Sequence, residues 1–187
     1  STVAYTGNNA AGNTTITNVI YNNLTLNNGS ETFVLAAALD VNDTVTITAG
    51  ALDVTASNFG ITAKSWTDTG AGTLTEGAGT VTFDVAGGTI NANETFNNVT
   101  INHGGTTTVS TNSLLAAGTL SVSSGTLDMN GIAGTFTGLA TISSGTYTAS
   151  TATQTFNGGL TVSGGTFTGS SGTFDVNATL TISSRTI

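Results

Sequence analysis

The chain has 187 residues, a net charge of −8 and only two cationic side chains, Lys64 and Arg185. Phosphate binding needs clustered Lys and Arg, so this composition argues against a nucleic-acid-binding protein. Charged residues make up 6% of the chain, cysteine is absent, and no apolar run is long enough to span a membrane as a helix.

The first stretch, residues 1–20, fits the pattern of the rest of the chain worst. We expect it to form an N-terminal cap or a strand exchanged with another copy. We expect residues 21–187 to form a single repeat domain, because no linker-like segment interrupts them.

An internal match relates the first half of the chain to the second half. Residues 21–26 (YNNLTL) recur as residues 96–101 (FNNVTI), a shift of 96 − 21 = 75, and the register holds without a gap to Leu52 against Leu127. We interpret this shift as four structural units of about nineteen residues (75/4). The markers of successive units are the pairs Thr25-Leu26, Thr46-Ile47, Ser65-Trp66, Asp84-Val85 and Thr100-Ile101.

From Ser121 onward the repeat is regular, and its units begin at Ser121, Thr141, Thr161 and Thr181 with no gap. Each position of the repeat keeps its chemical character from one unit to the next. A fixed period of this size, about 20 residues, is typical of stacked units that cannot bury their apolar faces alone. The apolar positions are Val122, Ile142, Val162, Ile182; Leu127, Tyr147, Phe167, Ile187; Phe136, Phe156, Val176; and Leu120, Ala140, Leu160, Leu180.

Within each unit, segments such as Thr-Val-Ser and Thr-Phe-Thr alternate polar and apolar residues, which predicts short strands with one buried side. Ser-Gly, Gly-Gly and Asn-Gly supply the bends between them. The sequence therefore predicts an all-β, single-domain parallel β-solenoid of about nine coils. Each coil has roughly 20 residues and three short strands, and lies about 4.8 Å above the previous one.

Phrases such as FNNVTINHGG, GTLSVSSGTLDMNG, GTVTFDV and TFNGGLTVSGGTFTGSSGTFDV occur along the chain. They resemble the β-strand-repeat regions of very large secreted bacterial surface proteins, which are similar to adhesin and autotransporter-passenger solenoids. The resemblance is compositional and extends from about Thr15 to the C-terminus. It implies an extracellular or cell-surface location and a structural and adhesive role, and it brings no catalytic residue and no cofactor.

Candidate catalytic and metal-binding residues are sparse. The ten acidic residues are scattered singly, and the one histidine, His103, lies in a predicted turn whose match in the first half is Asn28. We therefore expect no enzyme and no cofactor, and a polysaccharide-active β-helix enzyme is the least favoured alternative. The segment 40–43 (DVND) lacks the spacing of a known calcium loop, so we interpret its acids as strand-terminating residues.

Hydroxyl side chains repeat on the predicted outer surface. Thr141, Thr161 and Thr181 form one strip, and Thr146 and Thr166 belong to a second. Such strips resemble those of ice-binding β-solenoids, and ice binding is one alternative function. The simpler interpretation is that threonine is a good outward-facing strand residue.

The last unit ends at Arg185, Thr186 and Ile187, with Ile182 and Ile187 in apolar columns. An uncapped solenoid end exposes backbone donors and acceptors that template another strand. We therefore expect this end to stack on the first coil of another copy and build a head-to-tail homopolymer, the subunit of a surface fibre. The alternative is a segment of a large adhesin that binds a glycan or host surface on its lateral face.

Overall fold

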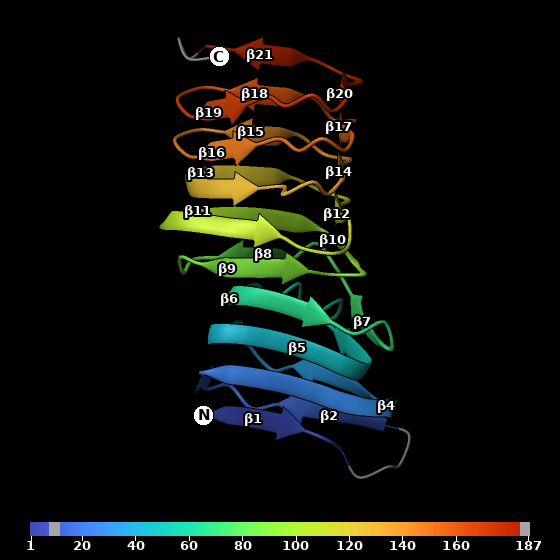
Figure 1. Ribbon diagram of the computed structural model, residues 1–187. Helices are drawn as coiled ribbons and strands as arrows, with labels where there is room; N and C mark the ends of the chain where they lie inside the picture. The colour runs from blue at the N-terminus through green and yellow to red at the C-terminus, as the bar shows by residue number, and fades with distance from the viewer. Residues whose placement is uncertain (8–11, 184–187) are drawn as a thin grey trace.

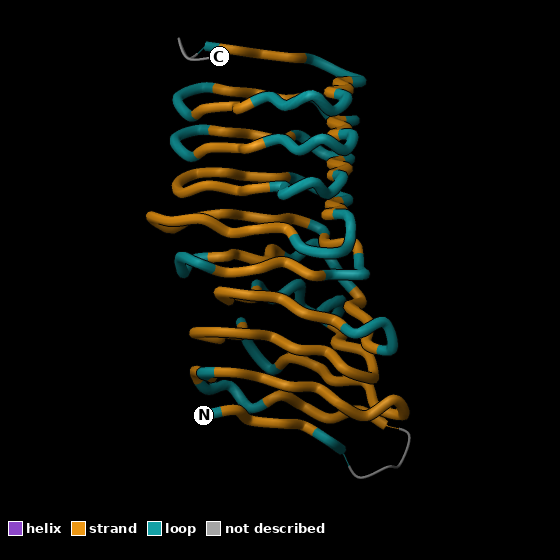
Figure 2. The backbone as a smooth tube through the Cα atoms, viewed as in Figure 1, coloured by secondary structure: helices purple, strands orange, loops and turns teal. Residues whose placement is uncertain are grey.

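The computed structural model describes residues 1–7 and 12–183, and these residues form β-strands and loops with no helix. The chain winds into a rod in which each turn lies above the previous one (Figures 1 and 2). Each turn has three strand segments, and each segment lies on a different face of the rod. We call these faces 1, 2 and 3.

Face 1 lies toward the viewer in Figure 1. Its segments are β1 (Thr2–Tyr5), the first part of β4 (Asn23–Leu35), the middle of β5 (Leu39–Asp53), the second half of β6 (Ile61–Asp68), β9 (Gly88–Asn91), the second half of β11 (Asn98–Val109), the second half of β13 (Leu120–Asp128), β16 (Thr146–Thr148) and β19 (Thr166–Thr168).

Face 2 follows along the chain and lies at the right of Figure 1. Its segments are β2 (Gly12–Ile16), the ends of β4 and β5, β7 (Gly72–Thr75), β10 (Thr95–Phe96), β12 (Leu114–Ala116), β14 (Gly134–Phe136), β17 (Gln154–Phe156) and β20 (Phe174–Val176).

Face 3 closes each turn. Its segments are β3 (Ile20–Tyr21), the starts of β5, β6, β11 and β13, and the strands β8 (Thr80–Phe83), β15 (Ala140–Ile142), β18 (Leu160–Val162) and β21 (Leu180–Ile182).

Every strand pairing of the described residues is parallel, and the pairings align equivalent residues of successive turns. One inward column on face 3 runs through the whole rod in eight steps, from Tyr21 to Ile182. The predicted parallel β-solenoid of about nine coils is confirmed. The column consists of Tyr21, Val41, Ala63, Phe83, Ile101, Val122, Ile142, Val162 and Ile182.

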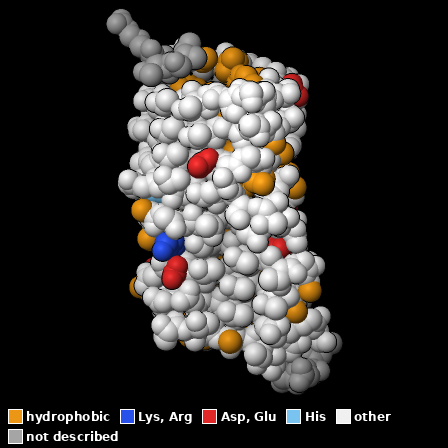
Figure 3. Space-filling view, in the orientation of Figure 1, with side chains coloured by type: hydrophobic (Ala, Val, Ile, Leu, Met, Phe, Trp, Pro, Cys, Tyr) orange, Lys and Arg blue, Asp and Glu red, His pale blue; other side chains and the backbone are white. Residues whose placement is uncertain are grey.

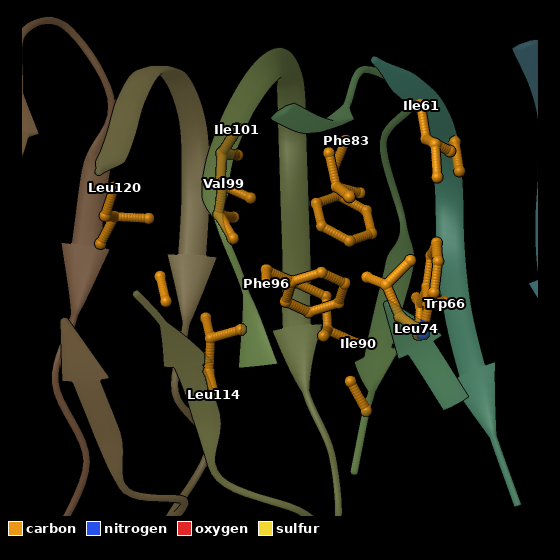
Figure 4. Packing of buried hydrophobic residues seen from close by; sticks show 14 of the residues in the cluster. Ile61, Trp66, Leu74, Phe83, Ile90, Phe96, Val99, Ile101, Leu114 and Leu120 are labelled. Atoms are coloured by element: carbon orange, nitrogen blue, oxygen red, sulfur yellow. The ribbon is translucent and has the colours of Figure 1, made fainter. Parts of the chain in front are cut away.

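The core lies between the three faces, because alternate side chains of each strand point inward. In the middle of the rod, the Trp66 ring packs edge-to-face on Phe96 at 5.3 Å between centroids, and Phe83 packs on Phe96 at 6.4 Å (Figure 4). Higher up, Tyr147 and Phe167 of successive coils stack with their rings 5.4 Å apart. Burial of these large side chains supplies most of the favourable free energy of folding.

The interpretation of the 75-residue match as four whole coils is wrong. Trp66 lies above Val45 rather than Ile47, and Ile101 lies above Phe83 rather than Val85. The matched strands β4 and β11 lie on different faces: β4 starts on face 1, whereas β11 starts on face 3. Both strands run around a corner, and Asn28 and His103 each accept the N–H two residues later at that bend. The match therefore records a similar local bend at two different corners and not a shared position.

Residues of the 1–20 stretch pair in parallel with the second coil, through β1 and β2 against β4. The Tyr5 and Tyr21 hydroxyls lie 2.8 Å apart, and Tyr21 donates to the Thr17 carbonyl oxygen at 2.6 Å. This hydroxyl network covers part of the lower end of the rod. Whether the stretch acts as a cap or as an exchanged strand stays a prediction.

The corners between faces 2 and 3 bring consecutive coils into close backbone contact. Gly118, Gly138 and Gly158 lie above one another there, and the Gly138 N–H donates to the Gly118 carbonyl oxygen at 2.8 Å. A Cβ atom on Gly138 would press against that same oxygen, closer than real Cβ contacts occur. Glycine is required at this corner for space.

We predict that Gly138→Ala lowers the free energy of unfolding by about 1–3 kcal/mol, because the added methyl group pushes two coils apart. Urea denaturation measures the change. Gly104→Ala is the matched control, since a Cβ at Gly104 meets no atom within 4 Å. Equal effects of the two substitutions would contradict the proposed close contact.

Candidate functional site

The upper end of the rod is open in the described residues. Ile182 and Leu180 of β21 are 44% and 45% exposed, whereas Val162 and Leu160, one coil below, are 2% and 1% exposed. Phe174 of β20 is 43% exposed. Figure 3 shows hydrophobic side chains gathered at this end. The predicted interface residues Arg185, Thr186 and Ile187 lie outside the described residues.

A hollow of about 270 Å³ lies at this open end. Phe167, Phe174, Leu180 and Ile182 from the last described coil line it, and Gln154 of the coil below also contributes. The hollow is mainly apolar, and it continues the inward columns that other coils fill. It therefore has the shape and chemistry to receive the inward side chains of one more coil.

The lower end differs from the upper one. Tyr21 and Ile16 are each only 2% exposed there, and the tyrosine hydroxyl network described above covers them. Val3 of β1, at the bottom of an inward column on face 1, is 42% exposed. Because the two ends carry different side chains, a contact between copies through these ends would be heterologous and would propagate.

The predicted hydroxyl strips lie on two different faces. Thr141, Thr161 and Thr181 are vertical neighbours on face 3, and Thr146 lies below Thr166 on face 1. The strip on face 3 continues downward through Ser121, which starts the regular repeat, and through three further rungs that the sequence did not reveal. The complete ladder of seven rungs consists of Thr62, Thr82, Thr100, Ser121, Thr141, Thr161 and Thr181.

Thr62, Thr82 and Thr100 could not be found from the sequence because the number of residues between successive rungs varies. The step from Thr82 to Thr100 is shorter than the step before it, and the step from Thr100 to Ser121 is longer, so no fixed period finds them. Insertions and deletions fall in the corners, whereas the ladder on face 3 keeps its pairing. Strand pairing conserves the stacking of the side chains even where the length of the coil changes.

The upper part of face 3 carries no charge. Its segments 119–123, 139–143, 159–163 and 179–183 contain only Thr, Ser, Gly and apolar residues. Phe174 is the one exposed aromatic side chain among the described residues, and it lies at the open end on face 2. Face 3 therefore lacks the exposed aromatic rings that dominate many protein–protein contacts.

His103 lies in the corner between faces 3 and 1, where it is 7% exposed. Its Nδ1 accepts the Gly105 N–H at 3.0 Å, so the proton is on Nε2, which donates to Thr107 Oγ1 at 2.7 Å. Asn28, its match in the first half of the chain, accepts the Ser30 N–H in the same way at 3.0 Å. The interpretation of His103 as a turn residue agrees with this geometry.

Burial lowers the pKa of His103, and the nearby Asp84 carboxylate opposes this shift. Below its ordinary pKa of about 6.5, the folded chain therefore binds fewer protons than the unfolded chain. The free energy of unfolding consequently falls as the pH drops below this value. Protonation of Nδ1 would also break its hydrogen bond with the Gly105 N–H.

We predict that His103→Asn reduces this acid sensitivity, because asparagine keeps the acceptor for Gly105 and does not titrate. At neutral pH the loss of the bond to Thr107 costs about 1 kcal/mol. Thermal unfolding measured from neutral pH to about pH 5 checks both effects. An unchanged slope between pH 6.5 and 5 would contradict the assignment.

The acidic residues do not converge on a metal site. Among the described residues, no group of three or more His, Asp and Glu side chains is placed to hold a metal ion. In the segment 40–43, Asp43 lies 3.8 Å from the Lys64 ammonium group, and both side chains are partly exposed. No helix in the described part of the chain is long and apolar enough to cross a membrane.

No family model, curated protein or solved structure matches the chain.

Proposed function

We propose that this chain is a non-catalytic structural protein of an extracellular or cell-surface fibre. Its coils assemble end to end, with the open upper coil of one copy stacked on the first coil of the next. The observation that carries the proposal is the exposed set Phe174, Leu180 and Ile182, whose counterparts one coil below are buried.

A second copy fits this end because of the parallel stacking. The upper edges of β19 on face 1 and β21 on face 3 have no strand partner among the described residues, and neither do the lower edges of β1 on face 1 and β3 on face 3. All strands on one face of the rod run in the same direction. The free N–H and C=O groups on the upper edge strands of one copy can therefore pair with those on the lower edge strands of a second copy. The exposed side chain of Val3 supplies apolar surface at the lower end.

The proposed location rests on the resemblance to bacterial β-strand-repeat surface proteins and on composition. A chain with two cations among 187 residues offers few sites to trypsin-like proteases, as suits a protein outside the cell. An adhesive role adds a partner on a lateral face. A glycan partner is less favoured than self-assembly, because sugar rings commonly stack on exposed aromatic side chains, which the described part of face 3 lacks.

We predict that the purified chain forms filaments of the rod's width at high concentration and that Ile182→Lys prevents this. A lysine in the apolar column would place an unpaired charge inside the stacked interface. Electron microscopy and light scattering over a concentration series measure the assembly. Leu139→Lys is the matched control, because Leu139 is 43% exposed but lies on the side of the rod.

Filaments in the wild-type and Leu139→Lys proteins, with single rods in Ile182→Lys, are the expected result. Single rods of uniform length for the wild-type chain at every concentration would overturn end-to-end assembly.

A second candidate function is ice binding through face 3. The observation that favours it is the seven-rung ladder, whose upper part is uncharged and presents threonine hydroxyl and methyl groups about 4.8 Å apart. Threonine is stiff about χ1, so stacked copies tend to share one rotamer and form a regular array. A rigid, repeating hydroxyl surface suits a partner that is itself a lattice of hydrogen-bonding oxygens.

This candidate predicts thermal hysteresis that is lost in Thr141→Lys, because a long charged side chain interrupts the array. Thr135→Lys is the control, since Thr135 is partly exposed in the same coil but lies on face 2. Measurements of the freezing and melting points of ice in the protein solution distinguish the two. An absence of hysteresis in the wild-type chain, or equal loss in both variants, would rule out ice binding.

A further inference from the structure

The rod contains a seam between its fourth and fifth coils. On face 1, β6 pairs with β9, and on face 3, β8 pairs with β11, so two faces continue across the seam without interruption. On face 2, β7 pairs with β5 below it and β10 pairs with β12 above it. In the described residues no strand pairing joins β7 to β10, and face 2 is divided into two sheets there.

Two carboxyl groups lie where the strand pairing is interrupted. The Glu94 carboxyl group, which precedes β10, lies near the backbone N–H of Leu74 in β7, and this N–H opposes the rise in the pKa of Glu94. Asp68 Oδ2, at the end of β6, accepts the backbone N–H of Asn93 at 2.6 Å. Asp68 therefore connects one coil to the next by a hydrogen bond, and Glu94 lies beside a backbone donor of the coil below.

Asp68 occupies a position that is apolar in the coils below. It lies directly above Ile47, which lies above Leu26, and its side chain is 3% exposed. Its second oxygen, Oδ1, has no hydrogen-bond partner. The Trp66 indole N–H lies near the Asp68 carboxyl group but does not reach hydrogen-bonding geometry with it, and it also has no partner.

The charges around the seam are all negative. The negative charges of Asp68 and Glu76 both act on Glu94 and raise its pKa. Lys64, the one lysine of the chain, pairs with Asp43. Among the described residues no ion pair compensates them, so two ionised carboxyl groups at the seam repel each other in a partly dehydrated environment. A proton on Asp68 Oδ1 would remove this repulsion and leave the Oδ2 bond to Asn93 in place.

We propose that the seam is a pH-dependent joint, closed when Asp68 carries a proton and loosened when Asp68 and Glu94 are both ionised. The joint acts on face 2 alone, because the continuous sheets on faces 1 and 3 hold the two halves of the rod together. Opening would separate β7 from β10 and give the rod a local bend. The proton comes from solvent, and no other reactant takes part.

The direction of the pH effect follows from the carboxyl groups themselves. Burial raises the pKa of Asp68, and burial together with the charge of Asp68 raises the pKa of Glu94. Between the ordinary and the raised values the folded chain binds more protons than the unfolded chain, so stability is lost as the pH rises through this range. This effect is opposite in sign to that of His103.

Hydrogen exchange of the Leu74 and Asn93 amides, corrected for the intrinsic rate at each pH, tests the joint. In the wild-type chain we expect their protection to fall as the pH rises from about 4 to 7, roughly tenfold for each unit by which the pKa is raised. Asp68→Asn removes the titrating group and should give protection that is high and independent of pH. Glu94→Gln, which removes the neighbouring charge, should move the wild-type transition to lower pH.

Asp128→Asn is the control, because Asp128 accepts a local bond from Asn130 on face 1, away from the seam. It should show the wild-type transition. Protection in the wild-type chain that does not change with pH would overturn the proposal. So would a transition that persists unchanged in both Asp68→Asn and Glu94→Gln. The measurement uses single rods at low concentration, so its outcome is independent of end-to-end assembly.

Discussion

The structure depends on one constraint, which is that side chains on paired strands lie about 4.8 Å from their counterparts in the next coil. Apolar side chains at this distance bury each other's surface, as the stacked rings of Tyr147 and Phe167 show. Like charges at this distance repel each other, whereas hydroxyl groups and amides can hydrogen-bond to their copies. The Asn177 side chain, for example, donates to Asn157 Oδ1 at 2.9 Å. The constraint therefore explains why only 6% of the chain is charged.

The same constraint explains where the chain is irregular. A long coil, from Val41 to Ala63, lies close to a short one, from Phe83 to Ile101, and the ladder on face 2 is interrupted in the same region. Asp68 lies at this interruption, in a column that is apolar below it. A buried carboxyl group without a stacked counterpart avoids like-charge repulsion along its column, but it must find partners elsewhere. The seam therefore combines an interrupted strand ladder with a carboxyl group, Asp68, whose pKa is raised by burial.

The upper half of the fold could be predicted from the sequence, because the constant step between units places Val122, Ile142 and Val162 in one column without any adjustment. The lower half could not be predicted in detail. Trp66 and Phe83 satisfy the apolar requirement of any face, so composition alone does not say which column they join. The open end was predicted from Ile182, but Phe174 was missed, because its counterparts Gly134 and Gln154 are not hydrophobic. Asp68 gave no signal, since a single acid in a strand usually faces solvent.

The proposed functions use two different parts of this architecture. End-to-end assembly extends the stacking of coils from one copy to the next, whereas ice binding and the pH-dependent joint use the sides of the rod. All three depend on the coils lying flat and in register. Spin labels on cysteines introduced in place of Thr62, Thr100 and Thr181 test this most directly, because these residues belong to one ladder and the native chain has no cysteine. Thr62 and Thr181 are six rungs apart, so electron-spin distance measurements should give about 29 Å, and Thr100 and Thr181, four rungs apart, about 19 Å. Two distances that do not differ by about two rungs would contradict the stacked-coil account.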